Sequence, residues 1–268
     1  MNPYYERNGI TIYHGDCREI LPSVTADVDI VLTDPPYGVA YSTGYRSGVV
    51  RSSTRLIGDL LVAPLLNDTA DALAPLLNDT AALYWFTAPE RLDVVLPILR
   101  RWDVPNVLVW DKGNCTAGDL ETTYGQQWEA VVYARKGRPA LLGGRDRDIL
   151  RFSRGNTALY LHPTQKPVAM LSYLISRHDG RTVLDPFAGS GTTLRAAKDL
   201  GRKAIGIEIE ERYCEIAAKR LETGSAPVGG ASVNPCRYES HRATDWLRPA
   251  GLWGPAAVVC GICHPPPP

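Results

Sequence analysis

Four consecutive residues, Asp34, Pro35, Pro36 and Tyr37, follow a short apolar segment and suit one chemical task. The two proline rings restrict the backbone, so the Asp34 carboxylate and the Pro35 carbonyl are expected to point in fixed directions. Two acceptors at a fixed spacing suit one planar amino group, which has two N–H donors, and the Tyr37 ring offers a surface for base stacking. The tetrapeptide therefore predicts a site for an exocyclic amine, with a plain proline turn after a strand as the alternative.

A glycine turn forms a second group. The segment Asp185–Gly191 reads DPFAGSG, follows the apolar residues 182–184 and precedes a helical pattern. Such a turn brings backbone N–H groups close to a ligand. Glu208 ends the next predicted strand, roughly 20 residues later, from where a carboxylate can bind both hydroxyls of a ribose. The three-glycine dinucleotide motif is missing, so a smaller adenosine-bearing ligand is favoured over NAD, and a tight turn without a ligand is the simpler alternative.

A third polar segment, His162–Pro167, reads HPTQKP and leads into another helical pattern. Its hydroxyl, amide and ammonium groups suit a small zwitterion. A simple helix cap would use the same residue types.

The elements that must position these groups alternate between strand and helix. Short apolar segments predict strands at residues 10–14, 28–33, 82–86, 107–110, 130–133, 182–184 and 204–207. Helical patterns occupy residues 89–101, 167–177, 192–200 and 211–221. This alternation predicts an α/β fold whose mostly parallel sheet is covered on both faces.

One octapeptide, APLLNDTA, occurs twice, at residues 63–70 and 74–81. The offset between the copies is close to three helical turns, which predicts a local duplication within one helical segment.

Taken together, the chain resembles the amino-methyltransferases of bacterial and phage DNA, in the permuted arrangement called the β class. The DPPY tetrapeptide precedes the FxGxG motif at Phe187–Gly191, as in that family, and HPTQKP is similar to its tenth motif. His14-Gly15-Asp16 is similar to the opening HGD of the family, and residues 110–113 and 127–129 are also similar. The resemblance covers about residues 4–222.

The resemblance implies a Rossmann-like class I S-adenosylmethionine-dependent methyltransferase fold with a circularly permuted motif order and a seven-stranded, mostly parallel sheet. The implied catalytic residues are Asp34, Pro35, Pro36 and Tyr37. The implied contacts to S-adenosylmethionine are Asp16, Thr164, Lys166, Asp185, Phe187, Gly189, Gly191 and Glu208. Thr164 and Lys166 are implied to lie near the methionine end, and target specificity to come from the short segment at about 135–161.

The implied reaction is methyl transfer to the exocyclic amine of a base that has left the duplex. In this family an Asp at the first position of the tetrapeptide goes more often with adenine N6, and a Ser with cytosine N4. Adenine is therefore favoured and cytosine N4 is the alternative. Cytosine C5 chemistry is excluded, because it needs a cysteine nucleophile, typically in a Pro-Cys context, and the only such pair is Pro235-Cys236 in the tail.

Two interpretations of other classes stay open. One is a non-catalytic DNA-binding protein that retains the fold, and the other is an RNA or protein methyltransferase. Proteins that methylate glutamine usually carry Asn in place of Asp34.

The charges of the chain balance, with 29 Lys+Arg against 29 Asp+Glu, so any preference for double-stranded DNA must come from their distribution. Seven basic and two acidic residues lie between Arg135 and Arg154, and three arginines without an acid lie between Arg46 and Arg55. The second segment follows Tyr37 and is predicted to be a loop that closes over the flipped base. The residues predicted to contact DNA are Arg46, Arg51, Arg138, Arg145, Arg147 and Arg151.

The composition changes near residue 222, which predicts a methyltransferase domain at 1–222, a linker at 223–235 and a Cys/Pro-rich tail at 236–268. The tail has ligand types and spacing that suit a tetrahedral Zn²⁺ site. The candidate ligands are Cys236, His241, Cys260 and Cys263. A disordered tail with incidental cysteines is the alternative, and haem attachment at Cys260–His264 is disfavoured without a secretory signal.

No apolar run approaches the length of roughly 20 residues that spans a bilayer, and the N-terminus lacks a secretory pattern. We therefore expect a cytoplasmic protein without a membrane partner. The sequence leaves open whether the chain forms a homodimer and whether a restriction endonuclease accompanies it.

Overall fold

The computed structural model describes residues 2–36, 52–114, 121–122, 124–154 and 165–222. The chain divides into two units, Met1–Ala226 and Pro227–Pro268, and the described residues all belong to the first. Several predicted site residues lie outside the described residues: Tyr37, Arg46, Arg51, Thr164, Cys236, His241, Cys260 and Cys263. The zinc site and the domain boundaries therefore stay predictions.

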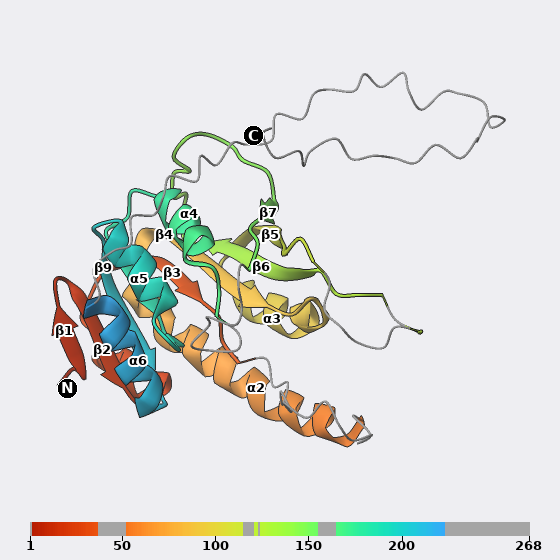
Figure 1. Ribbon diagram of the computed structural model, residues 1–268, viewed down its shortest axis with the longest axis horizontal. Helices are drawn as coiled ribbons and strands as arrows, with labels where there is room; N and C mark the ends of the chain where they lie inside the picture. The colour runs from red at the N-terminus through yellow and green to blue at the C-terminus, as the bar shows by residue number, and fades with distance from the viewer. Residues whose placement is uncertain (1, 37–51, 115–120, 123, 155–164, 223–268) are drawn as a thin grey trace, which may run out of the picture. The chain divides into compact units, whose positions relative to one another are not determined.

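Nine strands form one sheet within the described part of the chain, in the order β1-β2-β9-β8-β3-β4-β6-β5-β7 (Figure 1). The strands are β1 (Tyr5–Arg7), β2 (Ile10–His14), β3 (Val28–Thr33), β4 (Leu77–Thr87), β5 (Asp103–Asp111), β6 (Trp128–Arg135), β7 (Ile149–Arg151), β8 (Thr182–Asp185) and β9 (Lys203–Glu208). Five neighbouring pairs are parallel, whereas β1 is antiparallel to β2 and β6 is antiparallel to both β4 and β5. The mostly parallel α/β fold is thus confirmed.

The expected number of seven strands is wrong. All seven predicted strands are present, and the sheet gains β1 and β7 at its two edges. Each of these has three residues, which is too short for an apolar period to be visible in the sequence.

Helices cover both faces of the sheet. The α-helices are α1 (Cys17–Ile20), α2 (Ser52–Leu73), α3 (Leu92–Leu99), α4 (Val168–Ser176), α5 (Thr192–Asp199) and α6 (Glu211–Glu222), and the short 3-10 helices are η1 (Leu21–Ser23), η2 (Ala74–Leu76) and η3 (Pro89–Arg91). Side chains of α4, α5 and α6 share one apolar core with Ile30 and Leu32, and those of α1, α2 and α3 share another with Val31. Alternate residues of β3 thus point to opposite faces, as a pleated strand requires. Among the described residues no helix is long and apolar enough to cross a bilayer.

The two copies of APLLNDTA have different structures, so the prediction of one helical segment is wrong for the second copy. Residues 63–70 lie within α2, whereas residues 74–81 form η2 and the first part of β4. The second copy is drawn into the sheet because Leu77 pairs with Val28 of β3, and Asn78 donates to the Asp29 carboxylate. In the first copy the Thr69 hydroxyl donates instead to the carbonyl of Leu65, four residues earlier. Tertiary pairing therefore overrides local preference here.

Candidate active site

The predicted amine site and the predicted glycine turn lie at the same end of the sheet. Strands β3 and β8 are parallel neighbours. Asp34 directly follows β3 and Asp185 is the last residue of β8, so both lie at the carboxyl ends of adjacent strands. The Thr33 hydroxyl donates to Oδ1 of Asp185 at 2.8 Å and joins the two strand ends directly. We call this region the carboxyl end of the sheet, where open α/β sheets bind their ligands.

The turn between β8 and α5 requires glycine at two positions. Gly189 and Gly191 have φ values of 50° and 75°, in the left-handed region. A Cβ atom on Gly191 would also lie 2.6 Å from the Cβ of Ala217, so this glycine permits the close approach of α6. At Gly189, in contrast, a Cβ would meet no atom within 4 Å, and the backbone there borders open space. The turn thus leaves room for a ligand beside Gly189.

One buried acid, Asp185, and one half-buried acid, Glu208, border this turn. Glu208 accepts hydrogen bonds from the backbone N–H groups of Gly189 and Glu210, both at 2.8 Å. Asp185 accepts from Thr33 and from the backbone N–H of Phe187. Burial raises the pKa of Glu208 and raises the pKa of Asp185 to about 6, and the hydrogen bonds from these neutral donors, which lower both pKa values, do not offset it.

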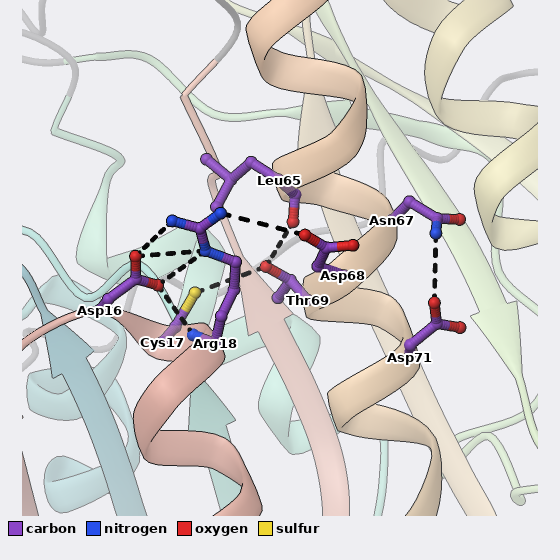
Figure 2. Close-up of polar contacts among 8 residues, drawn as sticks. All are labelled: Asp16, Cys17, Arg18, Leu65, Asn67, Asp68, Thr69 and Asp71. Carbon is purple, nitrogen blue, oxygen red and sulfur yellow. Dashed lines mark hydrogen bonds and ion pairs between the residues drawn. The ribbon is translucent and has the colours of Figure 1, made fainter.

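Asp16 lies beside this pair. It follows β2, whose His14 pairs with Glu208 of β9. Its carboxylate accepts from the backbone N–H of Arg18 at 2.9 Å and so caps α1, and the Arg18 guanidinium also binds it at 2.5 Å. Hydrogen bonding by Arg18 holds the pKa of Asp16 below its usual value. Figure 2 shows Arg18 between Asp16 and Asp68 of α2, with a guanidinium nitrogen 3.9 Å from the Asp68 carboxylate.

A cluster of charged side chains surrounds Asp34. The Lys166 ammonium lies 2.7 Å from Oδ2 of Asp34 and 3.0 Å from Oε2 of Glu129, and its side chain is only 5% exposed. Glu129 comes from the start of β6, next to the end of β4. Lys112 and Arg154 approach the same carboxylate at 3.5 and 3.8 Å. Three cations thus share two acids at this position.

The protonation states of the cluster follow from its charges. Burial alone lowers the pKa of Lys166, but Asp34 and Glu129 more than offset it, and the pKa is raised overall. Burial opposes ionisation of Glu129 as well, yet Lys166 and Lys112 hold its pKa below the usual value. The surrounding opposite charges therefore favour the charged forms of Lys166 and Glu129.

An arginine on α6 connects the predicted helix-leading segment to the glycine turn. Arg220 donates to the side chain of Gln165 at 2.6 Å, to the Thr192 hydroxyl at 2.8 Å and to the Ser190 hydroxyl at 3.3 Å. Burial lowers the pKa of this guanidinium. The residues around Lys166 and the start of α5 are thus fixed relative to one another.

The basic residues between 135 and 154 have different partners. Arg154 reaches Glu129, and Arg151 lies 3.8 Å from Asp111 at the end of β5. Arg145 and Arg147 instead line a cavity with Arg177, which is beside the carboxyl end of α4, whereas Lys166 precedes its amino end. Arg138 is exposed. Contact of these arginines with DNA stays a prediction.

A family model described as a DNA methylase matches residues 28–219. The chain belongs to this DNA methylase family. It is 32% identical to the protein YubD of Escherichia coli (strain K12) over 241 residues, which are 88% of this chain and 96% of that protein. It is 28% identical to the type II methyltransferase M2.DpnII of Streptococcus pneumoniae, over 82% of this chain and 92% of that one.

Among solved structures, the chain is similar to the crystal structure of an M1.HpyAVI–SAM complex. The TM-score is 0.61 and the identity 29%, over 79% of this chain and 99% of the other. The Rossmann-like fold of a DNA methylase is thereby confirmed.

Some site residues of this DNA methylase were not predicted from their own chemistry. Glu129 and Lys112 fall within short stretches that resemble the family, but nothing in those stretches indicates a partner for Asp34 or Lys166. Arg220 carries no sequence signal, because it is one cation among several on an amphipathic helix. Only the folded structure brings these three side chains to the site.

Proposed function

We propose that this DNA methylase transfers a methyl group from S-adenosylmethionine to the N6 amine of adenine in DNA. The observation that carries the proposal is the position of Asp34 beside the glycine turn, through the Thr33–Asp185 hydrogen bond. Membership of the DNA methylase family and the likeness to a structure whose title names SAM support the cofactor.

The residues at the glycine turn fit this cofactor. The open space at Gly189 can take the nucleoside, and the Glu208 carboxylate next to it suits two ribose hydroxyls. Asp16, Asp185, Phe187 and Gly191 are further proposed cofactor contacts, and Thr164 and Lys166 stay predicted contacts near the methionine end. When bound, S-adenosylmethionine supplies a methyl group that is activated by a sulfonium sulfur.

Asp34, Pro35 and Tyr37 are proposed to hold the base whose exocyclic amine receives the methyl group. An exocyclic amine is a poor nucleophile because its lone pair is delocalised into the ring. By accepting hydrogen bonds from its two N–H groups, Asp34 and Pro35 would favour a pyramidal nitrogen, return electron density to it and prepare it for the methyl group that the bound cofactor would supply, and Asp34 would accept the proton that the nitrogen gives up. Tyr37 stacking contributes about 1–3 kcal/mol toward holding the flipped base.

The preference for adenine rests on Asp34 as the first residue of the tetrapeptide. Methylation of cytosine N4 is the alternative, because the same two acceptors suit either amine. We place the protein in the cytoplasm of a bacterial or phage-infected cell, acting on double-stranded DNA.

The experiment is nucleoside mass spectrometry of DNA from cells that express the chain. We expect N6-methyladenine with the unchanged chain and with Asp93→Ala, an exposed acid on α3, but not with Asp34→Ala. N4-methylcytosine would overturn the base assignment. Absence of any modified base with the unchanged chain would overturn the enzymatic function.

A further inference from the structure

We propose that Glu129 is a positioning residue that holds Lys166 between two carboxylates, so that Asp34 keeps one oxygen directed at the substrate amine. The inference rests on the proposed function, and deepens it by assigning a task to a residue that does not itself meet the substrate.

The geometry places one ammonium between two acids from different strands. Lys166 is 2.7 Å from Oδ2 of Asp34, after β3, and 3.0 Å from Oε2 of Glu129, at the start of β6. The ring centroids of Phe86 and Trp110 lie 5.3 and 5.7 Å from the same nitrogen. An ammonium enclosed in this way has few alternative positions, and its ion pair with Glu129 helps to fix its position.

The charges explain why the second acid is needed. With Asp34 as its only acid, Lys166 would bind that carboxylate as a closed pair and draw electron density from the oxygen that must accept the amine. Glu129 shares the ammonium and leaves more of the Asp34 charge for the substrate. Lys112 and Arg154 in turn hold Glu129 in place, at 3.5 and 3.8 Å.

Removal of the Glu129 charge therefore has a specific effect on catalysis. We expect Glu129→Gln to lower kcat on the order of 10²-fold, because an interaction that matters in the transition state is weakened. KM for DNA should stay within about threefold, since Glu129 is not proposed to touch the base. A residue needed only for stability would not produce this separation of kcat from KM.

The same variant should change the pH dependence. In the described part of the chain, the charged groups around this position are Asp34, Glu129, Lys112, Arg154 and Lys166 itself, with Asp185 close enough to Asp34 to interact with it. Because Glu129 raises the pKa of Lys166, its neutralisation should move the alkaline limb of the kcat profile to lower pH, by about 1–3 units for a close opposite charge. The chain has six lysines, so the Lys166 titration can also be followed directly by NMR of lysine labelled with ¹³C at Cε.

A double-mutant cycle with Lys166→Met tests whether Glu129 acts through Lys166. We expect the double variant to be no slower than Lys166→Met alone, because the two residues act as one unit. Glu215→Gln, which removes an exposed acid paired with Lys219, is the matched control and should keep the kcat and pH profile of the unchanged chain.

An unchanged kcat and alkaline limb in Glu129→Gln, or independent losses in the cycle, would overturn the inference. If Glu129→Gln does not fold, Glu129→Asp serves instead, because it keeps the charge but shortens the reach by one methylene; it should lose kcat, and full activity would count against us. An inactive unchanged chain refutes the proposed function, whereas an active chain that is insensitive to Glu129 refutes only this inference. The NMR titration separates the two cases without any turnover.

Discussion

The carboxyl end of the sheet contains two pairs of acids that are stabilised in different ways. Asp34 and Glu129 share a buried ammonium, and further cations surround them. Asp185 and Glu208, only one or two strands away, accept mainly from hydroxyl and backbone N–H groups. The pKa of Glu129 is consequently lowered, while burial raises the pKa values of Asp185 and Glu208. The Asp34–Glu129 pair is thus stabilised by fixed charge, and the Asp185–Glu208 pair by neutral donors.

The largest effect should come from the charge of Asp34. Asp34→Asn keeps the size of the side chain but loses the charge, so we expect kcat to fall on the order of 10³-fold, or about 4 kcal/mol. Calorimetric affinity for S-adenosylmethionine should change less than about threefold. A comparable loss of cofactor affinity would show that the proposed amine site and cofactor site are not separate.

Asp185 should make stability depend on pH. Its folded pKa of about 6 lies above the ordinary value of 3.8, so the unfolded chain loses this proton more readily. The contribution to stability is thus greatest below pH 4, falls as pH rises toward 6, and is constant above, with a difference of about 3 kcal/mol.

Asp185→Asn should abolish this dependence. Urea unfolding between pH 4 and 7 measures it, with the exposed Asp93→Asn as the control. Parallel stability curves for Asp185→Asn and the unchanged chain would show that Asp185 is ionised throughout.

Glu208 should affect binding in preference to chemistry. Glu208→Gln weakens the acceptor proposed for the ribose, so we expect the Kd for S-adenosylmethionine to rise about 10- to 100-fold, or about 2 kcal/mol, from hydrogen bonds to a charged group. At saturating cofactor, kcat should stay within about fivefold of the unchanged chain. The reverse result, a normal Kd with a depressed kcat, would contradict the division between these two sites.

The smallest effect on activity is expected from Arg220, which links the segment before α4 to the glycine turn. Arg220→Met removes the bonds from α6 to Gln165 and Thr192, and should lower kcat/KM for the cofactor about fivefold, or about 1 kcal/mol. Arg212→Met on the same helix is the matched control, because that side chain is 67% exposed. Equal kcat/KM values for the two variants would mean that the hydrogen bonds of Arg220 do not contribute to activity.

Much of this protein could be predicted from sequence because its signals are local. Strand β3 begins and ends at the predicted residues, and α4, α5 and α6 begin or end within one residue of theirs. The two acid-bearing motifs each follow a strand, and parallel strands bring their carboxyl ends together whatever their order in the chain. The edge strands β1 and β7 were missed because three residues show no period.

Only the tertiary structure determines features that depend on contacts between residues far apart in the sequence. The octapeptide APLLNDTA is helical at residues 63–70 and partly a strand at 74–81, because only the second copy leads into β4: its Leu77 pairs with Val28 of β3, and its Ala81 carbonyl accepts from the backbone N–H of Lys136. Nothing in the sequence around Lys166 indicates whether its ammonium binds a ligand or lies between Asp34 and Glu129. Sequence determines which groups a chain possesses and their local backbone preference, whereas burial and charge pairing arise only when distant segments are packed together.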